Sequence, residues 1–487
     1  MKLFKLTLIA ATVASLASPL AAQAATEFDN FTPQIGDTTP LNPGSATPYR
    51  LPSANFSQVT IADRATQNTL VPGSNSGNWD MIAANETGAD AGRYLFMPWE
   101  IFSTSVPTKA GVQRIDLWDN NYNTRTTTIV AAGTQNFSSG DASRWTPWGG
   151  YLTAEESWGA NSTAGRLFEV TNPTTAAANA GNFVQRSVIP RVSHEGLAFD
   201  KSNNLYFVDE LNGGSVYKYT SANPLATNGN DFFSAGQTFA LKVQAGGQFE
   251  GNNAAAITGS STWEAITDVN GGALAGISAL LGDGTIDGRA TADHADVKGT
   301  GFNRPEDLEI QNLADGNQFL YFTTTDSDND GNTANGRGRV YSYNVGSSEV
   351  KLFADSNTID AATGLAAGSA FKNPDNLAID DEGNIYIVED QDGGVEDVWF
   401  ALDANRDGVA ESVSKWISLT TAGAESTGLY FDKFNPNKAY INVQHPADGI
   451  DRTIELTAAP VPVPGAVWLF GSALMGFLGF SRRNKKA

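Results

Sequence analysis

Acidic residues recur at the same two positions in a series of short, β-rich repeats. Some stand at the start of the first run of a repeat, and others stand at the end of its second run. The starts carry His194, Glu195, Glu306, Asp307 and Asp375, and the ends carry Glu155, Glu156, Asp209, Glu210, Glu389 and Asp390. Antiparallel neighbours bring the start of one run and the end of the next to the same edge. Carboxylates gathered there repel one another unless cations bind among them, so the pattern predicts a site for several metal ions.

Two further residues fall at the same edge. His445 ends the second run of the last repeat, and Arg304 precedes the Pro305-Glu306 start of another. Imidazole is a ligand for transition metals, and a guanidinium can hold an anionic oxygen group through two N–H bonds. We expect Arg304 and Glu195 to take part in catalysis, and the metal ligands to be Glu155, Glu156, His194, Glu195, Asp209, Glu210, Glu306, Asp307, Asp375, Glu389 and His445. The competing interpretation is that the acids are turn residues and that Arg304 only pairs with Glu306.

A separate acidic loop has the spacing of a calcium-binding loop. Its oxygen-bearing residues alternate, Gly408 stands at the sixth position, and the series is Asp403, Asn405, Asp407 and Glu411. Loops of the EF-hand type have this pattern, although Ser414 stands where their bidentate Glu would be. We predict a structural Ca²⁺ ion here, and a weaker site of the same kind at 326–331. The alternative for both is a tight Asp/Gly turn without an ion.

The repeats that carry these residues are pairs of short β runs joined by polar turns. The clearest pairs are 194–199 with 205–210, 305–310 with 319–324, 374–379 with 385–390, and 426–431 with 439–443. Weaker pairs are 94–102 with 112–117, and 148–155 with 165–170. Repeated β-meanders of this size predict an all-β fold, a β-propeller of about six blades. Seven blades are possible, and a β-sandwich or a solenoid is the less favoured alternative. If the first runs are innermost, the acidic residues meet at one mouth of the central channel.

Both ends of the chain have the composition of export signals. Residues 1–24 combine Lys2 and Lys5 with an apolar stretch and a small-x-small cleavage site, which predicts a secretory signal peptide. Residues 460–487 combine a Pro-Val repeat, an apolar run and a basic end, which predicts a C-terminal hydrophobic helix that contacts the membrane at least transiently. The propeller is therefore expected over 25–459. Within it, 223–300 breaks the repeat and is interpreted as an excursion between blades, with one weak helical stretch at 273–281.

Composition excludes several classes of function. The chain has no Cys, so thiol chemistry and thiolate metal sites are impossible. Its net charge of −22 repels nucleic acid and anionic lipid, so nucleic acid is not an expected partner. The same charge suits a protein that holds Ca²⁺ through oxygen ligands, although solubility alone would explain it. The sequence contains no G-x-S-x-G elbow, P-loop or H-E-x-x-H motif.

Several motifs resemble known families. The C-terminal segment resembles PEP-CTERM tails of Gram-negative bacteria, which implies processing by an exosortase, and the alternative is a plain membrane anchor. The order Thr146-Pro-Trp-Gly-Gly-Tyr-Leu-Thr-Ala-Glu-Glu156, His194-Glu195, Phe302-Asn-Arg-Pro-Glu-Asp307, Asp375 and Gln444-His-Pro446 resembles the PhoX family of exported alkaline phosphatases. That resemblance implies a propeller with Ca²⁺ and iron at its channel mouth that hydrolyses phosphomonoesters. It also implies metal or phosphate contacts at Glu155, Glu156, Glu195, Arg304, Glu306 and Asp307.

One residue departs from the family pattern. The family has a Cys that binds iron directly before the Glu pair, and this chain has Ala154 there. Because a thiolate favours iron over hard cations, the departure speaks against iron or another transition metal and leaves Ca²⁺ as the expected ion.

The expected function follows from the motifs and this departure together. We expect an exported, metal-dependent hydrolase of small phosphoesters at the cell surface, in the outer envelope or in the extracellular matrix of a Gram-negative bacterium. The alternative is a non-catalytic, calcium-stabilised propeller of the surface or matrix. A lactonase-like hydrolase is a weaker third possibility.

Overall fold

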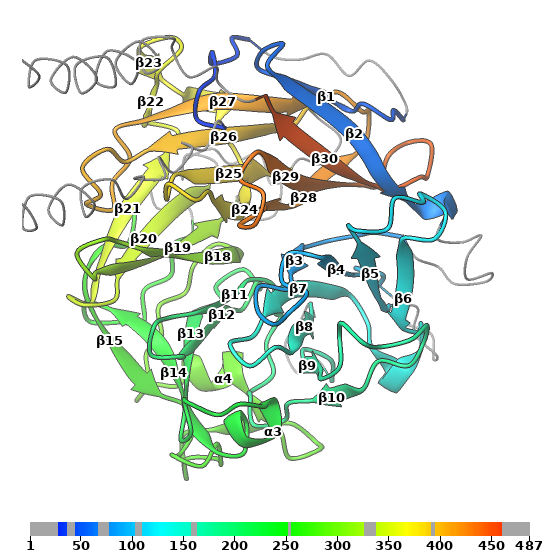
Figure 1. The fold of residues 1–487 in the computed structure, drawn as a ribbon. Coiled ribbons are helices and arrows are strands. Elements are labelled where there is room, and N and C mark those ends of the chain that lie inside the picture. Colours follow the sequence, from blue (N-terminus) through cyan, green and yellow to red (C-terminus); the bar gives the residue numbers. More distant parts are fainter. Residues whose placement is uncertain are drawn as a thin grey trace, which may run out of the picture.

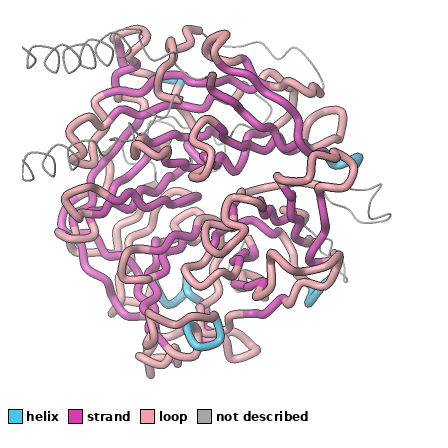
Figure 2. The backbone as a smooth tube through the Cα atoms, in the orientation of Figure 1, coloured by secondary structure: helices cyan, strands magenta, loops and turns pink. Residues whose placement is uncertain are grey.

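Antiparallel β-meanders around a common centre make up the protein. The computed structural model describes residues 28–36, 44–66, 77–102, 110–156, 163–251, 255–325, 338–390 and 395–459. Strands and loops dominate these residues, and helices are few and short (Figures 1 and 2). The fold is therefore all-β, as the sequence predicts. The expected export signals at 1–24 and 460–487, and the acidic loop at 326–331, lie outside the described residues. No helix in the described part of the chain is both long and apolar enough to cross a membrane.

The first three meanders follow one another along the chain, and each forms a sheet in sequence order. The first contains β3 (Ala83–Ala84), β4 (Tyr94–Pro98), β5 (Val112–Asp116) and β6 (Thr126–Val130). The second contains β7 (Gly140–Trp145), β8 (Tyr151–Glu155), β9 (Leu167–Val170) and β10 (Phe183–Gln185). The third contains β11 (Leu197–Phe199), β12 (Leu205–Val208), β13 (Val216–Ser221) and β14 (Gly236–Val243). The two weaker repeats of the sequence are thus genuine meanders.

The last three meanders repeat this order, and the N-terminal part of the chain completes the final one. The fourth contains β18 (Pro305–Asn312), β19 (Gln318–Thr324), β20 (Arg339–Asn344) and β21 (Glu349–Asp355). The fifth contains β24 (Pro374–Ile379), β25 (Ile385–Glu389), β26 (Asp397–Leu402) and β27 (Ser412–Leu419). The sixth contains β28 (Glu425–Phe431), β29 (Lys438–Gln444) and β30 (Arg452–Ala458). Strand β2 (Phe56–Asp63) pairs with β30 and joins the two ends of the described chain. Strand β1 (Tyr49–Arg50) pairs with β27.

The first strand of each meander is the innermost one. Strand β18 lies beside β11 and β24, β24 lies beside β28, and β7 lies beside β3 and β11. The labels of these strands surround the centre of Figure 1. Apolar side chains fill the space between neighbouring meanders, as where Ala198 and Tyr206 pack with Leu308 and Leu320. Each large side chain buried in this way contributes about 1.5–3 kcal/mol to stability. This packing holds the starts of the innermost strands together at one mouth of the channel.

The segment 223–300 does more than interrupt the repeat. It supplies β14 and then β15 (Gly259–Ala265), which pairs with both β14 and β21 and so joins the third and fourth meanders. The prediction of a helical stretch at 273–281 is wrong. Gly276 has a φ of +76°, Ser278 Oγ accepts from Leu274 N and donates to Ile266 O, and a strand follows. The remaining elements of the segment are α3 (Gly229–Phe232), β16 (Ala279–Leu280), β17 (Ile286–Asp287) and α4 (Gly288–Ala292).

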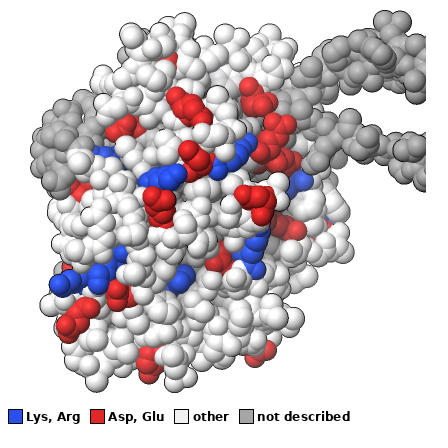
Figure 3. Space-filling view, turned by 90° about the vertical axis from the view of Figure 1, so that its left-hand side faces the viewer, with Lys and Arg blue, Asp and Glu red and all other residues white. Residues whose placement is uncertain are grey.

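Small elements occupy the periphery. They are β22 (Ile359–Asp360), β23 (Leu365–Ala366), η1 (Thr134–Asn136) and η2 (Gly368–Ala370). On the outer face shown in Figure 3, acidic and basic side chains are interspersed. This face therefore carries no large patch of a single sign among the described residues (Figure 3).

Candidate metal centre

One mouth of the channel holds a small acidic cavity. Its volume is about 200 Å³, and every meander contributes carboxylates to it. The lining residues are Asp80, Glu100, Phe102, Asp141, Glu156, Glu195, Glu210, Arg304, Glu306, Asp375, Asp390, Glu425 and His445. They stand at strand ends, as Glu156 does directly after β8 and Glu306 does at the start of β18. The fold therefore gathers residues from distant parts of the chain into one site.

Three of these carboxylates are close enough to share a cation. Glu195, Glu306 and Asp375 each offer an oxygen atom, and the three atoms lie within 4.8 Å of one another. Each of the three residues is at most 7% exposed. Glu195 Oε1 accepts weakly from Asn376 Nδ2 at 3.4 Å, while the buried Glu195 Oε2 has no hydrogen-bond partner among the described residues. A buried carboxylate oxygen without a donor is costly, and a bound cation would satisfy it.

The pKa shifts of the three carboxylates also indicate a cation site. Burial, followed by repulsion from neighbouring carboxylates, raises the pKa of Glu195 and Asp375 well above the ordinary range. Burial raises the pKa of Glu306 to about 8, even though Arg304 acts in the opposite direction. On the other side of the cavity, burial raises the pKa of Asp80 to about 7. Without added positive charge these groups favour their protonated forms, whereas a divalent cation would favour the ionised ones.

Arg304 places a guanidinium in the acidic cavity. Its Nη2 lies 2.6 Å from Glu210 Oε1 and 3.3 Å from Glu306 Oε1. Burial opposes its charge, but Glu306 and Glu210 outweigh that effect and raise its pKa well above its ordinary value. Arg304 is therefore permanently charged beside the three carboxylates. Its fork of N–H groups can hold a tetrahedral oxyanion that enters the cavity.

In each adjacent pair of the sequence pattern, one residue lines the acidic cavity and the other does not. Glu156, Glu195, Glu210 and Glu306 line the cavity, while their chain neighbours take other contacts. Glu155 pairs with Arg166 Nη2 at 2.5 Å, and Asp209 lies 3.3 Å from Arg289 Nε. His194 is fully buried with its ring 5.2 Å from that of Phe207. Consecutive residues of an extended chain point to opposite sides, which explains why one member of each pair lines the cavity and the other does not. Metal binding by Glu155, His194 and Asp209 stays a prediction.

Two further predicted ligands also lie behind the cavity wall. Asp307 accepts from Leu308 N at 2.7 Å and from Leu377 N at 2.9 Å, which ties β18 to β24. Glu389 accepts from Trp399 Nε1 at 2.7 Å and from Lys372 N at 3.0 Å, while its neighbour Asp390 lines the cavity. Both acids thus accept hydrogen bonds outside the lining of the acidic cavity, and metal binding by either of them stays a prediction.

The pairing of Glu155 with Arg166 gives a stability prediction. The change Glu155→Gln removes the charge that compensates a mostly buried guanidinium. We expect the free energy of unfolding to fall by about 3 kcal/mol, since breaking a buried ion pair leaves one charge unpaired. Urea unfolding of the two proteins measures it. Unchanged stability combined with lost metal binding would return Glu155 to the metal site.

Several residues of the acidic cavity are absent from the predicted ligands. Asp390 belongs to the acidic pattern of the sequence but not to the predicted ligands, and Glu425 opens the last repeat, so both had a visible signal. Asp80, Glu100 and Asp141 belong to the weak N-terminal repeats, where no motif marks them. Gln444 Nε2 donates to Asp80 Oδ2 at 3.1 Å and to Glu100 Oε2 at 3.0 Å, which connects these acids to the last meander.

His445 reaches the same side of the cavity as Glu425. Its Nε2 lies 3.9 Å from Glu425 Oε2 and 4.0 Å from Glu100 Oε2, and its side chain is 45% exposed. Burial lowers its pKa, so the imidazole is neutral at pH 7 and can act as a ligand. His445 therefore offers a nitrogen donor beside oxygen donors.

The loop predicted to hold a structural Ca²⁺ ion is closed by its own backbone. Asp403 accepts from Asp407 N and Gly408 N, Asn405 accepts from Asp407 N, and Asp407 accepts from Val409 N, all at 2.9–3.1 Å. Glu411 Oε2 accepts from Ala404 N at 2.8 Å. The loop joins β26 to β27 at the strand ends away from the acidic cavity. These contacts fit the alternative of a tight turn, and Ca²⁺ binding there stays a prediction.

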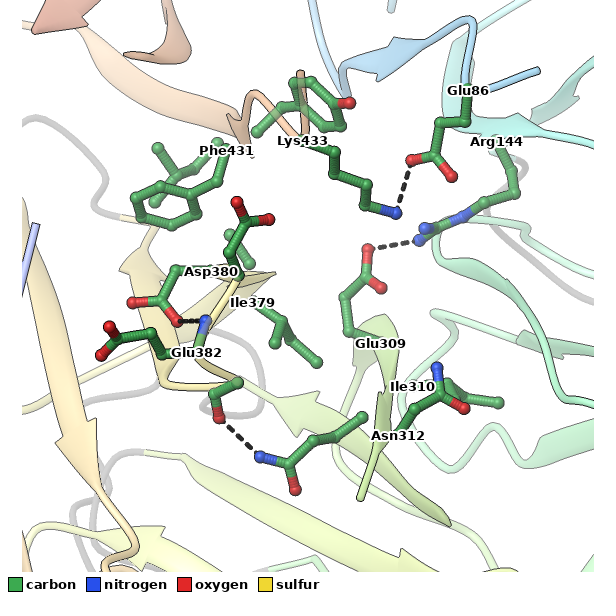
Figure 4. A pocket seen from close by; sticks show the side chains of 16 residues that line it. Glu86, Arg144, Glu309, Ile310, Asn312, Ile379, Asp380, Glu382, Phe431 and Lys433 are labelled. Atoms are coloured by element: carbon green, nitrogen blue, oxygen red, sulfur yellow. Dashed lines mark hydrogen bonds and ion pairs between the residues drawn. The ribbon is translucent and has the colours of Figure 1, made fainter. Parts of the chain in front are cut away.

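The opposite mouth of the channel has a different character. A pocket of about 300 Å³ lies there, and Figure 4 shows its side chains. Lys433 Nζ points to Glu86 Oε1 at 2.7 Å, and Arg144 Nη2 points to Glu309 Oε1 at 2.5 Å. Cations and carboxylates compensate each other in these pairs. Asp380, Asp381 and Glu382 also line this pocket, so both mouths are acidic. The first mouth is the stronger candidate for metal chemistry because it holds the group of carboxylate oxygens within 4.8 Å of one another that the described residues provide.

Comparison with known proteins identifies the fold and the family. The solved structure of Pseudomonas fluorescens PhoX in complex with vanadate, described as a transition state analogue, superposes with a TM-score of 0.61. The two chains are 17% identical over 88% of this chain and 98% of that chain, so the likeness establishes a shared propeller-type fold. A Bacteroides thetaiotaomicron protein of unknown function is 14% identical over 82% of this chain and 76% of its own, with a TM-score of only 0.39. A search of curated protein sequences found no match.

The sequence model described as alkaline phosphatase PhoX matches residues 119–447. This range contains most of the acidic cavity and all of the innermost strands from β7 to β28. The chain therefore belongs to the PhoX family of alkaline phosphatases.

Proposed function

We propose that the protein is a cation-dependent phosphomonoester hydrolase that works at the acidic cavity. The observation that carries this proposal is the set of Glu195, Glu306 and Asp375, with a buried oxygen of Glu195 lacking a donor, beside the guanidinium of Arg304. Three buried carboxylates this close destabilise each other unless a cation lies among them. Membership of the PhoX family supports a phosphate ester as the substrate.

The residues divide the work by their chemistry. Glu195, Glu306 and Asp375 would hold a cation, which when bound would polarise a phosphoryl oxygen and orient water. Arg304 donates N–H groups to another phosphoryl oxygen and neutralises charge that develops there. A phosphate dianion could not approach this many carboxylates by itself, because like charges repel strongly in a partly buried site. The cation is therefore required for binding as well as for chemistry.

The donor set favours Ca²⁺ as that cation. The three central ligands are carboxylates, which are hard donors suited to Ca²⁺. Ala154 is fully buried in an apolar cluster with Leu152, Leu167 and Leu197, and it offers no metal ligand. We infer that the central site of this chain does not need iron, because the softer thiolate donor that would favour it is missing.

Architecture and location complete the proposal. We interpret each of the six meanders as one propeller blade within 25–459, with 223–300 as an elaboration of the third. We propose that residues 1–24 direct export and that residues 460–487 are sorted by an exosortase-type protease after transient contact with the membrane. The protein would then act on small phosphoesters at the cell surface, in the outer envelope or in the matrix, where Ca²⁺ is abundant.

Metal analysis combined with an activity assay tests the proposal. The purified protein should contain Ca²⁺ after dialysis against calcium-containing buffer, and it should release phosphate from 4-nitrophenyl phosphate. A protein that binds Ca²⁺ but hydrolyses no phosphoester with any divalent cation would be the non-catalytic, calcium-stabilised propeller. A protein that binds no divalent cation would overturn the assignment of the acidic cavity.

A further inference from the structure

A second cavity lies beside the acidic cavity, since chain neighbours line the two. Its volume is about 440 Å³, a size that holds a small organic ligand. One wall is the turn between β12 and β13, and the other walls come from the segment 223–300. The residues that matter here are Asp209, Tyr217, Gln248, Phe249 and Arg289. We call it the side cavity.

The side cavity and the acidic cavity share a partition. Glu210 lines the acidic cavity, and the next residue, Leu211, lines the side cavity. Gly213 N donates to Phe302 O at 2.7 Å, so the turn between β12 and β13 is held against the segment that precedes Arg304. Asn303 N donates to Glu250 Oε2 at 3.0 Å, so Glu250, which follows Phe249, is bound to the same segment. A ligand group in the side cavity would therefore be a close neighbour of a phosphate held by Arg304.

The side cavity contains polar groups whose hydrogen-bonding capacity is unused. Asp209 and Tyr217 are both fully buried and line it. Asp209 Oδ2, the Tyr217 hydroxyl and Gln248 Oε1 have no hydrogen-bond partner among the described residues. Buried polar atoms are nearly always paired, so three unpaired ones along one cavity point to a missing partner. Two are acceptors and one is a hydroxyl, which matches a ligand that carries several hydroxyl groups.

Two cations, Arg289 and Lys298, and two acids, Asp209 and Asp293, line the side cavity, and this balance favours a neutral occupant over a second phosphate. Arg289 is 8% exposed, and its charge is compensated by Asp209 at 3.3 Å. Phe249 adds an apolar wall, since the residue lines the cavity and is 46% exposed. An aromatic face beside neutralised polar groups suits a neutral ring with hydroxyl groups, and sugars have this chemistry.

We propose that the side cavity binds the sugar portion of a sugar phosphate while its phosphate occupies the acidic cavity. This inference rests on the proposed phosphatase function and names the substrate class. It also gives the segment 223–300 a role, because that segment builds most of the side cavity.

The test compares glucose 6-phosphate with methyl phosphate, which has no sugar. In Tyr217→Phe, we expect kcat/KM for glucose 6-phosphate to fall about tenfold, the effect of one lost hydrogen bond, while kcat/KM for methyl phosphate stays the same. Phe249→Ala, a half-exposed position, should raise KM for glucose 6-phosphate about fivefold through the lost aromatic wall. The matched control is Tyr206→Phe, because that hydroxyl already donates to Asp200 Oδ2 at 3.1 Å. Tyr206→Phe should lower thermal stability without changing the ratio of kcat/KM for glucose 6-phosphate to kcat/KM for methyl phosphate.

The outcomes separate the side cavity from the proposed function. If kcat/KM falls equally for both esters, or if neither variant changes kcat/KM or KM for glucose 6-phosphate, the sugar site is overturned while the phosphatase function stands. If the wild type hydrolyses 4-nitrophenyl phosphate but not glucose 6-phosphate, the sugar site is overturned and the phosphatase function stands. If it hydrolyses none of the three esters, the proposed function fails. In that case calorimetric titration with glucose decides: binding that Tyr217→Phe abolishes supports the side cavity, and equal binding or none overturns it.

Discussion

Replacing Glu306 with Gln should lower kcat for phosphomonoester hydrolysis by at least about 100-fold. Even residues that only support a metal ligand cost about 10- to 100-fold when they are replaced, so the loss of a ligand should cost no less. Glu306 makes two kinds of contact in this geometry, since its carboxylate lies with those of Glu195 and Asp375 and also 3.3 Å from Arg304 Nη2. The Gln variant keeps the size of the side chain and removes its charge, so the cation would lose a ligand and Arg304 a fixed partner.

Steady-state kinetics at several Ca²⁺ concentrations measures the effect of Glu306→Gln. If Glu306 holds the cation, more Ca²⁺ should restore part of the lost activity. The matched control is Glu309→Gln on the same strand, because Glu309 pairs with Arg144 at the opposite mouth of the channel. We expect that control to retain the wild-type kcat. Full activity in Glu306→Gln would exclude this residue from the metal centre, and equal losses in both variants would indicate general damage to β18.

Much of this architecture follows from local sequence signals. The alternation of short β runs and polar turns predicts the meanders, and the acidic residues at strand ends predict which mouth carries the site. The pattern does not tell which member of an adjacent acidic pair faces the cavity. Glu195 and Glu306 line the cavity while His194 and Asp307 do not, and this depends on the twist and register of each strand at its end.

Other features depend on contacts between distant parts of the chain. Asp80, Glu100 and Asp141 join the acidic cavity only because the first and last meanders meet, with Gln444 bridging Asp80 and Glu100. The segment 223–300 looks irregular in sequence, yet β15 is held by β14 and β21 from two different meanders. Tertiary pairing of this kind overrides the weak helical preference at 273–281, where Gly276 and Ser278 shape a turn instead.

Removing the cation should abolish activity and make the stability of the protein fall as the pH rises. In the cation-free protein, burial raises the pKa of Glu306 to about 8 and the pKa of Glu195 and Asp375 well above the ordinary range. The unfolded chain releases these protons near pH 4.5, whereas the folded one retains them until much higher pH. The folded state thus binds more protons between these values, so the free energy of unfolding decreases with rising pH.

The melting temperature is best measured above pH 6.5, because below that pH the titration of His194 changes the stability in the opposite direction. Burial lowers the pKa of His194 to about 3, so this residue makes stability rise with pH, but only up to the pKa of an unfolded histidine near 6.5. From pH 6.5 to 8.5, the melting temperature of the EDTA-treated protein should fall by about 5 °C or more. Added Ca²⁺ should reverse this fall, and its stabilising effect should grow with pH because protons compete with the cation for the same oxygens.

A variant links this pH dependence to the acidic cavity. Asp307 and Glu389 also have pKa values raised to about 8 by burial, but they lie behind the cavity wall and their contribution should not respond to Ca²⁺. The difference between the melting curves with Ca²⁺ and with EDTA therefore isolates the groups inside the cavity. In Glu306→Gln this difference should shrink at pH 8.5 and change least at pH 6.5, because one carboxylate no longer titrates. A calcium effect that is independent of pH in both proteins would place the cation elsewhere, with the loop at Asp403 and Asp407 as the first site to examine.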